Sequence, residues 1–414
     1  MRLMHTADWH VGRTIRGRSR AAEFEAVLGE VVAVARDEQV EAMLVCGDIW
    51  DSATAAPESD RIVFEALREC IGHGIQVVLL AGNHDSPRKL EAIGLLSELL
   101  GVQTQSHVRR PDAGGVLSID GREHEARIAA VPFITESRYV DAAAVMGLQE
   151  DWFGAYADGV AGIYRAMCAG FGRDTVNILA THVFIDGARL AALDGSERVL
   201  HIGQAYGVAP ASLPSEPQYI ALGHIHEPQE LLSTPVPTAY SGSLLQLDFG
   251  ERGQQKVVRI IDAVPGRPVE QRAVPLSAGR PLVELRGSFD EVLAQAEAVP
   301  DAHLRVRLDV EQPEPGLAER VRDALPAAVD VQLDYELTDD EGGDETLAQL
   351  TAEELFARYY VAQHGAAPAP ELLGLFHQLL DEVEAAHVAE LAGSDGEPPI
   401  DAGLTHSAEA VGAR

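Results

Sequence analysis

The chain has 414 residues, of which 46% are hydrophobic and 23% are charged, and its formal net charge is −33. This length predicts two or three domains, and this composition excludes a wholly disordered chain and a collagen-like repeat. The three cysteines form no CxxC pair, which argues against a disulfide scaffold and a thiolate zinc site. The few unpaired cysteines fit a reducing cytoplasm, and no apolar run is long enough to span a bilayer, so we expect no membrane partner.

The charge is distributed unevenly along the chain. From residue 334 to the end there are 18 acidic residues against 2 arginines, whereas residues 8–20 hold four arginines against one aspartate. The overall charge taken alone argues against a nucleic-acid partner. An acidic protein can nevertheless bind a phosphate backbone through metal ions and a local basic strip. In that case we expect this chain alone to bind weakly and in a salt-sensitive way.

Five short apolar runs are typical of strands buried on both faces, and each ends at polar residues. The runs cover residues 2–7, 42–46, 76–81, 176–181 and 219–222. Helical patterns at 22–38 and 61–72 separate the early runs, which predicts a layered α/β fold. Because ligands gather at the carboxyl ends of the strands in such sheets, the polar residues after the five runs predict one shared site.

The second half of the chain begins with strands predicted at 244–249 and 256–262, which would close the sandwich, and a break follows at 265–268. We therefore expect the first domain to cover residues 1–265. A small α+β domain is predicted over residues 280–336, because the pattern there alternates between strand and helix. Its expected elements are a strand at 282–285, a helix at 289–298, a strand at 304–308, a helix at 316–325 and a strand at 329–333.

An acidic linker at 338–344 precedes a helical segment expected over residues 345–392. Its helices are predicted at 351–364 and 370–392, and the second carries one apolar stripe. The stripe consists of Leu372, Phe376, Leu379 and Val383. It could pack on its own domain, but two helices behind a linker lack an obvious core, which favours a partner-binding surface. The tail at 393–414, rich in Gly, Pro and Asp, is predicted to be disordered.

The polar residues at the strand ends carry groups that bind metals. Asp8 and His10 lie two positions apart, as do His224 and His226, so each pair can point to one side of an extended segment and bind one cation. Each pair alone is weak evidence, because half-exposed loop residues show the same spacing. Asp48 at its strand end is equally well explained as the N-cap of a helix.

The segment Gly82-Asn83-His84-Asp85 is more specific. The side-chain oxygen of Asn83 is a neutral ligand for a hard cation, and the next residue, His84, should point away from that cation. His182 follows a clean apolar strand, where a lone histidine is more often structural.

These residues are more informative together than singly. Five of the fifteen histidines fall at predicted strand ends, and their nitrogen atoms combine with carboxylate and amide oxygens but no thiolate. Such a mixed set suits Mn²⁺ or a similar divalent ion. Seven candidate ligands are too many for one ion, and they predict two ions that share a bridging group and act together on a phosphoryl centre. The seven are Asp8, His10, Asp48, Asn83, His182, His224 and His226.

The motif order DxH, GDxxD, GNHD, H and GHxH resembles that of the calcineurin-like metallophosphoesterase superfamily. The resemblance implies a β-sandwich flanked by helices. It further implies that Asp8, His10, Asp48 and His226 hold a first metal ion, while Asp48, Asn83, His182 and His224 hold a second. His84 is then the unliganded histidine that stabilises the transition state or protonates the leaving oxygen. Asp51 is its expected partner, as in the Asp–His pair of phosphatases, although an ordinary turn residue also fits this position.

Within the superfamily the chain is similar to the bacterial SbcD family of nuclease subunits, on three metal motifs and on Tyr240-Ser241-Gly242-Ser243. The metal motifs are Asp8-Trp9-His10-Val11-Gly12-Arg13, Gly47-Asp48-Ile49-Trp50-Asp51 and Gly82-Asn83-His84-Asp85-Ser86. The α+β module and the helix pair match that family's capping domain and ATPase-docking helices. The similarity implies Mn²⁺-dependent cleavage of DNA, as a 3′→5′ exonuclease on duplex ends and as an endonuclease on hairpins, for recombination and repair.

The same similarity implies an SbcC-type ABC ATPase as partner, with this chain a homodimer inside a heterotetramer that acts on DNA near the nucleoid. Residues 142–164 are a possible dimer-interface helix, but they could equally be core. Their large apolar side chains are Val145, Leu148, Trp152 and Tyr156. The alternative enzyme function is hydrolysis of small phosphodiesters or phosphomonoesters on the same metal site. A DNA-end-binding scaffold with a dead site would need a missing ligand, and none is missing.

A basic strip follows the first metal motif directly. Arg13, Arg16 and Arg18 lie within six residues and are candidates for contacts with DNA phosphates. A solvated loop is an equally good interpretation of this strip.

Overall fold

A computed structural model describes residues 1–97, 101–135, 142, 145–146, 156–190, 207–310, 316–335, 352–364, 368–369 and 372–376. The chain divides into two compact units. The first comprises Met1–Asp309 and Arg320–Gln332, and the second comprises Val310–Glu319 and the residues from Leu333 onward.

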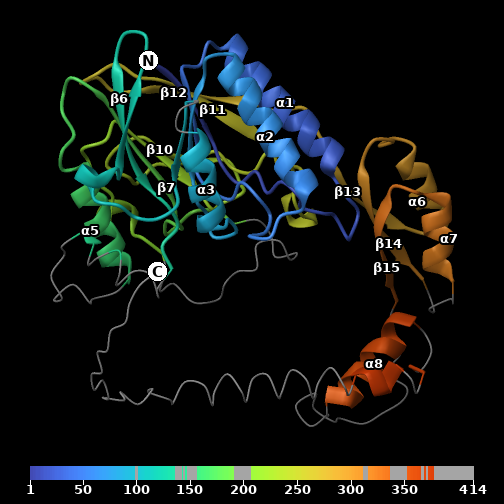
Figure 1. The fold of residues 1–414 in the computed structure, drawn as a ribbon. Helices are drawn as coiled ribbons and strands as arrows, with labels where there is room; N and C mark the ends of the chain where they lie inside the picture. The colour runs from blue at the N-terminus through green and yellow to red at the C-terminus, as the bar shows by residue number, and fades with distance from the viewer. Residues whose placement is uncertain are drawn as a thin grey trace, which may run out of the picture. The chain divides into compact units, whose positions relative to one another are not determined.

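The first unit contains two six-stranded mixed sheets (Figure 1). In one sheet β1 to β4 run parallel to one another. β11 pairs antiparallel with β1, and β12 pairs antiparallel with β11 at the edge of the sheet. Its strands, in spatial order, are β12 (Glu270–Pro275), β11 (Val257–Asp262), β1 (Arg2–Thr6), β2 (Ala42–Val45), β3 (Gln76–Leu80) and β4 (Val102–Gln105).

The other sheet has four parallel central strands, with an antiparallel strand at each edge. Its strands, in spatial order, are β5 (Val116–Asp120), β6 (Glu125–Val131), β7 (Val176–His182), β8 (Tyr219–Gly223), β10 (Thr238–Tyr240) and β9 (Gln229–Leu231).

The two sheets pack face to face through fully buried side chains such as Leu44 from β2 and Ile178 from β7. Helices cover both outer faces. The first sheet is covered by α1 (Ala21–Asp37), α2 (Pro57–Gly72) and α3 (Pro87–Ser97), and the second by α5 (Tyr156–Cys168). The layering is therefore helix, sheet, sheet, helix, and the predicted fold class is confirmed.

The five apolar runs form β1, β2, β3, β7 and β8, whose side chains are almost all buried because both faces of each strand are covered. The strand expected at 244–249 does not form. Three of its residues, Leu244, Leu245 and Leu247, are buried in the core, but the segment is irregular and leads into a 3₁₀ turn, η5 (Phe249–Glu251). The expected break at 265–268 is the turn that joins β11 to β12, so the first sheet continues beyond it.

A three-stranded sheet follows, with the strands β13 (Leu282–Gly287), β14 (His303–Asp309) and β15 (Ala328–Asp334) in that order. Its helices are α6 (Phe289–Ala296) and α7 (Leu317–Ala324), as the sequence predicts. Ser288 caps α6 by accepting a hydrogen bond from the backbone of Glu291, whose side chain bonds back to the backbone of Ser288.

In the first unit this module contacts the strip that follows the first metal motif. Ile15, Phe249 and Leu282 form a small buried cluster, and His303 Nε2 lies 2.7 Å from Glu23 Oε1 at the start of α1. The module is therefore anchored to the segments that flank the metal motifs.

In the second unit, α8 (Ala352–His364) confirms the first predicted helix of the pair. The Phe356 ring stacks on Phe376 at 4.3 Å between centroids and 8° between planes. Leu372 and Phe376 are half-buried, while Leu379 and Val383 lie outside the described residues. The assignment of this stripe to a partner surface stays a prediction.

The predicted helix region 142–164 contains the start of α5, whose Val160 and Ile163 are buried against the second sheet. Val145 is 45% exposed and Tyr156 is half-buried, while Leu148 and Trp152 lie outside the described residues. The described part of this region thus contributes to the core, and the dimer interface stays a prediction. Among the described residues, no helix is both long enough and apolar enough to cross a membrane.

Candidate metal centre

The loops at the carboxyl ends of β1, β2 and β3 meet those that follow β7 and β8. His224 N donates to Asp8 Oδ1 at 2.9 Å, although the two residues are 216 positions apart. His84 N donates to Asp48 Oδ1 at the same distance. The strand ends of both sheets therefore converge on one place, as the sequence predicts.

Asp8, His10 and His226 form one group in which the potential ligand atoms all lie within 4.8 Å of one another. All three residues are buried, and His10 Nε2 lies 3.1 Å from His226 Nε2. Two ring nitrogens of different histidines thus face each other beside a carboxylate.

Asp48 lies between this group and His182. Its Oδ2 atom is 3.5 Å from His10 Nε2 and 3.4 Å from His182 Nε2. One carboxylate therefore reaches both sides of the centre, which is the geometry that a bridging ligand requires.

Asn83 lies beside two of the histidines, His182 and His224. Its Oδ1 atom lies 2.9 Å from His182 Nε2 and 3.1 Å from His224 Nδ1. The structure thus brings together all seven ligands predicted from the sequence, from the carboxyl ends of five strands.

The protonation of His182 tests whether these donors fit a cation. Its Nδ1 atom lies 2.8 Å from the main-chain oxygen of Cys46, which can only accept, so Nδ1 carries the hydrogen. In the neutral ring Nε2 then has a lone pair, and that lone pair faces the oxygens of Asn83 and Asp48. Acceptor atoms converge in this way where a divalent cation binds, and imidazole with carboxylate and amide oxygens suits such an ion.

The buried charges also favour a cation. Burial, with Asp48 as a like charge, raises the pKa of Asp8 to about 6, although His182 and His226 oppose the rise. Burial alone would lower the pKa of His182, but the Asp48 and Asp8 carboxylates raise it to about 9. The two carboxylates thus attract positive charge into the pocket, which either a protonated His182 or a bound cation supplies.

Four of the predicted ligands have a backbone conformation that L-residues seldom adopt. The φ angles are 51° at Asp8, 48° at His10, 51° at Asp48 and 103° at His224. Each such residue costs on the order of 1–3 kcal/mol and persists only where its surroundings enforce it. The loops accept this strain while turning four ligands towards one centre.

Two glycines allow the ligand loops to approach closely. A Cβ atom on Gly82 would lie 2.1 Å from Asp48 Oδ1, and one on Gly47 would lie 2.2 Å from His182 Nδ1. These distances are far below van der Waals contact, so the glycines of the GD and GN motifs are required for the ligands to pack.

His84 lies beside the ligands, with its ring centroid 4.8 Å from that of His10. Its Nδ1 atom donates to the main-chain oxygen of Asp51 at 2.8 Å. The Asp51 carboxylate points elsewhere, with Oδ1 3.4 Å from His10 Nδ1 and 3.3 Å from an Arg13 guanidinium nitrogen. His84 is therefore held by Asp51, as expected, but through the backbone and not through the expected carboxylate.

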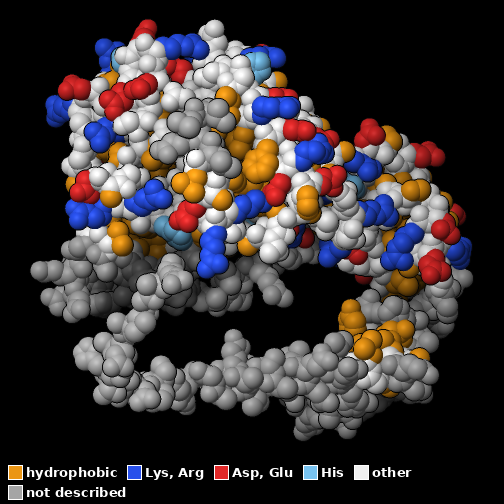
Figure 2. Space-filling model, viewed as in Figure 1, with side chains coloured by type: hydrophobic (Ala, Val, Ile, Leu, Met, Phe, Trp, Pro, Cys, Tyr) orange, Lys and Arg blue, Asp and Glu red, His pale blue; other side chains and the backbone are white. Residues whose placement is uncertain are grey.

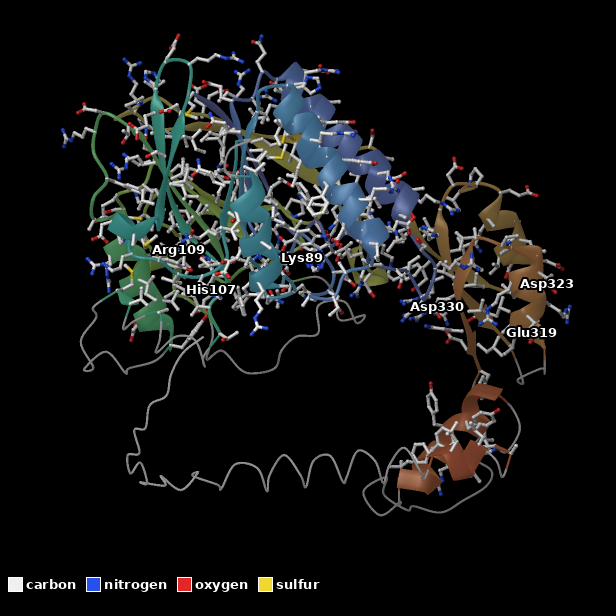
Figure 3. The ribbon with its side chains drawn as sticks, in the orientation of Figure 1. Lys89, His107, Arg109, Glu319, Asp323 and Asp330 are labelled. Carbon is white, nitrogen blue, oxygen red and sulfur yellow. The ribbon has the colours of Figure 1, made fainter. Side chains whose placement is uncertain are left out.

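Two arginines of the basic strip already bond to oxygen atoms of the protein. Arg18 donates to the main-chain oxygens of Pro326 and Ala328, and Arg16 pairs with Asp330 at 3.2 Å. Asp330 lies on β15 (Figure 3). A pocket of about 300 Å³ borders the strip and Asp51. On the face shown in Figure 2, basic and acidic side chains are interspersed over the described part of the first unit.

Three residues beside the ligands have roles that the sequence does not predict. Asp85 belongs to a metal motif, and its buried carboxylate accepts hydrogen bonds from the backbone of Ile49, Trp50 and Gly82, which ties two ligand loops together. Phe133 stacks on His224 at 5.8 Å and 21°. The third is Glu251.

Glu251 carries no motif signal and lies 25 residues after His226 in the sequence. Its Oε1 atom is nevertheless 2.9 Å from His226 Nδ1, and its side chain is fully buried. A single sequence offers no pattern that would have identified this contact.

Comparisons with known proteins agree with this geometry. The family model for calcineurin-like phosphoesterases matches residues 1–228, and the model described as the type 5 capsule protein repressor C-terminal domain matches residues 278–364. Several bacteria have relatives that are named as the D component of nuclease SbcCD. The Bacillus subtilis protein is 31% identical over 93% of this chain and 99% of its own length.

Two other relatives with that name show similar identity over a shorter span. The Rhodobacter capsulatus protein is 32% identical over 73% of this chain and 77% of its own length. The Escherichia coli K12 protein is 29% identical over 75% of this chain and 78% of its own length.

Proposed function

Because the chain belongs to the calcineurin-like phosphoesterase family, and within it to the SbcD nucleases of SbcCD, we propose that it cleaves DNA with two Mn²⁺ ions. The chain is a metal-dependent phosphodiesterase of the hydrolase class. The finer proposal is a 3′→5′ exonuclease on duplex ends and an endonuclease on hairpins and single strands, acting in recombination and repair.

One observation carries the proposal: seven nitrogen and oxygen donors from the ends of five strands converge without a thiolate. We assign Asp8, His10, Asp48 and His226 to one ion. We assign Asp48, Asn83, His182 and His224 to the other. The 3.5 Å and 3.4 Å distances from Asp48 Oδ2 to His10 and His182 support the bridging role of that carboxylate. Bound ions would polarise a phosphodiester and lower the pKa of a water molecule.

His84 is the proton-handling residue of the proposal. Its Nδ1 hydrogen is committed to the Asp51 oxygen, so Nε2 is the ring atom that can give a proton to the leaving oxygen. The backbone oxygen of Asp51 fixes the orientation of the ring, and Nε2 carries the transferable proton when the ring is the doubly protonated imidazolium. The Asp51 carboxylate, beside His10, instead supports the orientation of a metal ligand.

We further propose that Arg13, Arg16 and Arg18 contact DNA phosphates near the metal centre. Arg13, next to Asp51 and the 300 Å³ pocket, is best placed for this role. Arg16 and Arg18 already bond to the α+β module, so DNA must compete with those contacts or add to them.

The partner proposal follows from the relatives' name, which describes one component of a larger nuclease. We propose an SbcC-type ABC ATPase as the partner and a homodimer of this chain within a heterotetramer, acting on DNA in the cytoplasm near the nucleoid. The stacked Phe356 and Phe376 support a helix pair that presents one combined surface. The exposed side chains of Tyr359 and Leu375 lie on this pair and offer apolar contacts.

A nuclease assay tests this proposal directly. The full chain, with Mn²⁺ and with or without the coiled-coil ATPase, is given blunt duplex DNA, hairpin DNA and a small chromogenic phosphodiester. We expect shortening of duplex ends and opening of hairpins, with stimulation by the ATPase. Hydrolysis of the chromogenic diester with both DNA substrates left intact would contradict the nuclease proposal and favour a small-molecule phosphoesterase.

A further inference from the structure

Glu251 lies directly behind a ligand of the metal centre. It ends the 3₁₀ turn η5, has no exposed surface, and places its Oε1 atom 2.9 Å from His226 Nδ1. An ionised carboxylate can only accept hydrogen bonds, so the hydrogen of this contact belongs to His226 Nδ1.

The second oxygen of Glu251 is also fully used. Its Oε2 atom accepts hydrogen bonds from Lys256 Nζ at 2.7 Å and from the backbone of Leu247 at 3.0 Å. Lys256 forms a buried ion pair with this carboxylate, and every partner of the carboxylate is a hydrogen-bond donor. Glu251 is therefore an anion with a fixed orientation.

Lys256 holds His226 from a second direction. Its ammonium group is nearly buried and donates to the main-chain oxygen of His226 at 3.0 Å. The backbone of Ser243 donates to the same oxygen at 3.1 Å. The ring of His226 is thus held by Glu251, and its backbone is held by the cation that neutralises Glu251.

The contact with Glu251 decides which atom of His226 can bind a metal. With the hydrogen on Nδ1, the lone pair is on Nε2, which faces His10 Nε2 at 3.1 Å. His182 shows the same arrangement with a neutral acceptor, the main-chain oxygen of Cys46. A carboxylate behind His226 orients the ring more firmly and increases its basicity as a ligand.

We propose that Glu251, supported by Lys256, is a positioning residue that fixes the tautomer and orientation of His226 as a metal ligand. This proposal rests on the metal-binding part of the proposed function and not on its DNA substrate. The competing explanation is that the Glu251–Lys256 pair only stabilises the fold of the segment from 243 to 256. The two explanations differ in what they predict for metal affinity in a folded variant.

The test compares Glu251→Gln with Glu23→Gln in the full chain. Glu23 is a matched control, because it too bonds a histidine, His303, at 2.7 Å and a buried arginine, Arg20, but no metal ligand. Mn²⁺ binding is measured by isothermal titration and by electron paramagnetic resonance of the free ion, with circular dichroism as the check on folding.

We expect Glu251→Gln to bind one of two Mn²⁺ equivalents about 10–100-fold more weakly, while Glu23→Gln binds both as the wild type does. A folded Glu251→Gln variant that binds both equivalents with wild-type affinity would overturn the proposal. Because no DNA is present, failure of the nuclease proposal would not alter either result.

A second variant addresses the lone charge that the first one leaves behind. Glu251→Gln breaks a buried ion pair and leaves the Lys256 ammonium without its carboxylate, which destabilises the fold. The double variant Glu251→Gln/Lys256→Met removes both charges and keeps the volume. We expect it to fold and to show the same loss of affinity at one site, and unchanged affinity at both sites would likewise reject the role given to Glu251.

Discussion

His84 is bonded to the backbone of Asp51, not to its side chain: Nδ1 lies 2.8 Å from the main-chain oxygen, while the carboxylate faces His10 and Arg13. Replacing the Asp51 side chain therefore leaves the contact with His84 in place. The two residues should have separable effects.

We expect His84→Gln to lower the rate of DNA cleavage by about 10²–10⁴-fold at saturating Mn²⁺, because the variant loses the proton donor and keeps every predicted ligand. Asp51→Asn should instead weaken Mn²⁺ binding and leave the rate at saturating metal within about tenfold of wild type, because an amide oxygen still reaches His10. Single-turnover cleavage over a Mn²⁺ titration separates the two. Equal rate losses in both variants at saturating metal would support a carboxylate–imidazole pair.

Neutralising the basic strip should change the salt dependence of DNA binding. For Arg13→Gln/Arg16→Gln/Arg18→Gln, we expect weaker binding and a smaller slope of log affinity against log salt, by about 0.9 for each DNA phosphate that is no longer neutralised. Fluorescence anisotropy on duplex DNA at several salt concentrations measures both quantities.

The control removes the same number of charges elsewhere, in Arg36→Gln/Arg61→Gln/Arg272→Gln, whose arginines pair with carboxylates at exposed sites. If both triple variants change the slope equally, the strip has no special role in DNA binding. Thermal unfolding is recorded alongside, because Arg16 and Arg18 also bond to the α+β module.

The contact of Glu23 with His303 and Arg20 should make stability depend on pH. Burial opposes the charged form, but these two partners lower the pKa of Glu23 from 4.5 to about 2. Because the folded-state pKa is depressed, the stabilisation is complete above about pH 4.5 and is lost as the pH falls towards 2. Its upper limit is about 3 kcal/mol.

We therefore expect Glu23→Gln to be less stable than the wild type at pH 6, with a difference that shrinks as the pH falls below 4.5. Urea unfolding at a series of pH values measures this difference. The matched control is Glu65→Gln on α2, which removes an exposed carboxylate and should shift stability only slightly. A difference that is constant between pH 6 and pH 3 would show that the Glu23 carboxylate does not carry the effect.

Removal of the chain from residue 351 onward should separate partner binding from metal binding. We expect the truncated protein to lose co-purification with the SbcC-type ATPase and to keep both Mn²⁺ equivalents, because all seven predicted ligands precede the cut. Paired pull-down and metal titration provide the readout. Continued association with the ATPase would place its binding surface elsewhere.

The sequence predicts some strands far better than others, and burial explains the difference. Strands such as β2 and β7 are covered on both faces and therefore appear as unbroken apolar runs. The edge strand β12 is largely exposed and carries no such run, so the sequence does not predict it. Residues 244–249 are apolar because they enter the core, but Glu251 and Ser243 bond to the backbone there, which satisfies it without a strand.

Within the candidate site, too, the sequence predicts some residues and misses others. The places of Asp48 and Asn83 in the cluster could be predicted because both residues stand at strand ends in recognisable motifs. The bond from His84 to the backbone oxygen of Asp51 could not be predicted, because a sequence does not specify which atom of a residue accepts a hydrogen bond. Glu251 could not either, since only the folded loop brings it to His226.

The central claim is that seven side chains hold two divalent cations, and anomalous diffraction from crystals of the full chain soaked in Mn²⁺ tests it most directly. We predict two anomalous peaks about 3.5–4 Å apart. Asp48 should lie between them, with His10 and His226 at one peak and Asn83, His182 and His224 at the other. Crystals with no peak among these residues, or with one peak that leaves Asn83, His182 and His224 uncoordinated, would contradict the two-metal account.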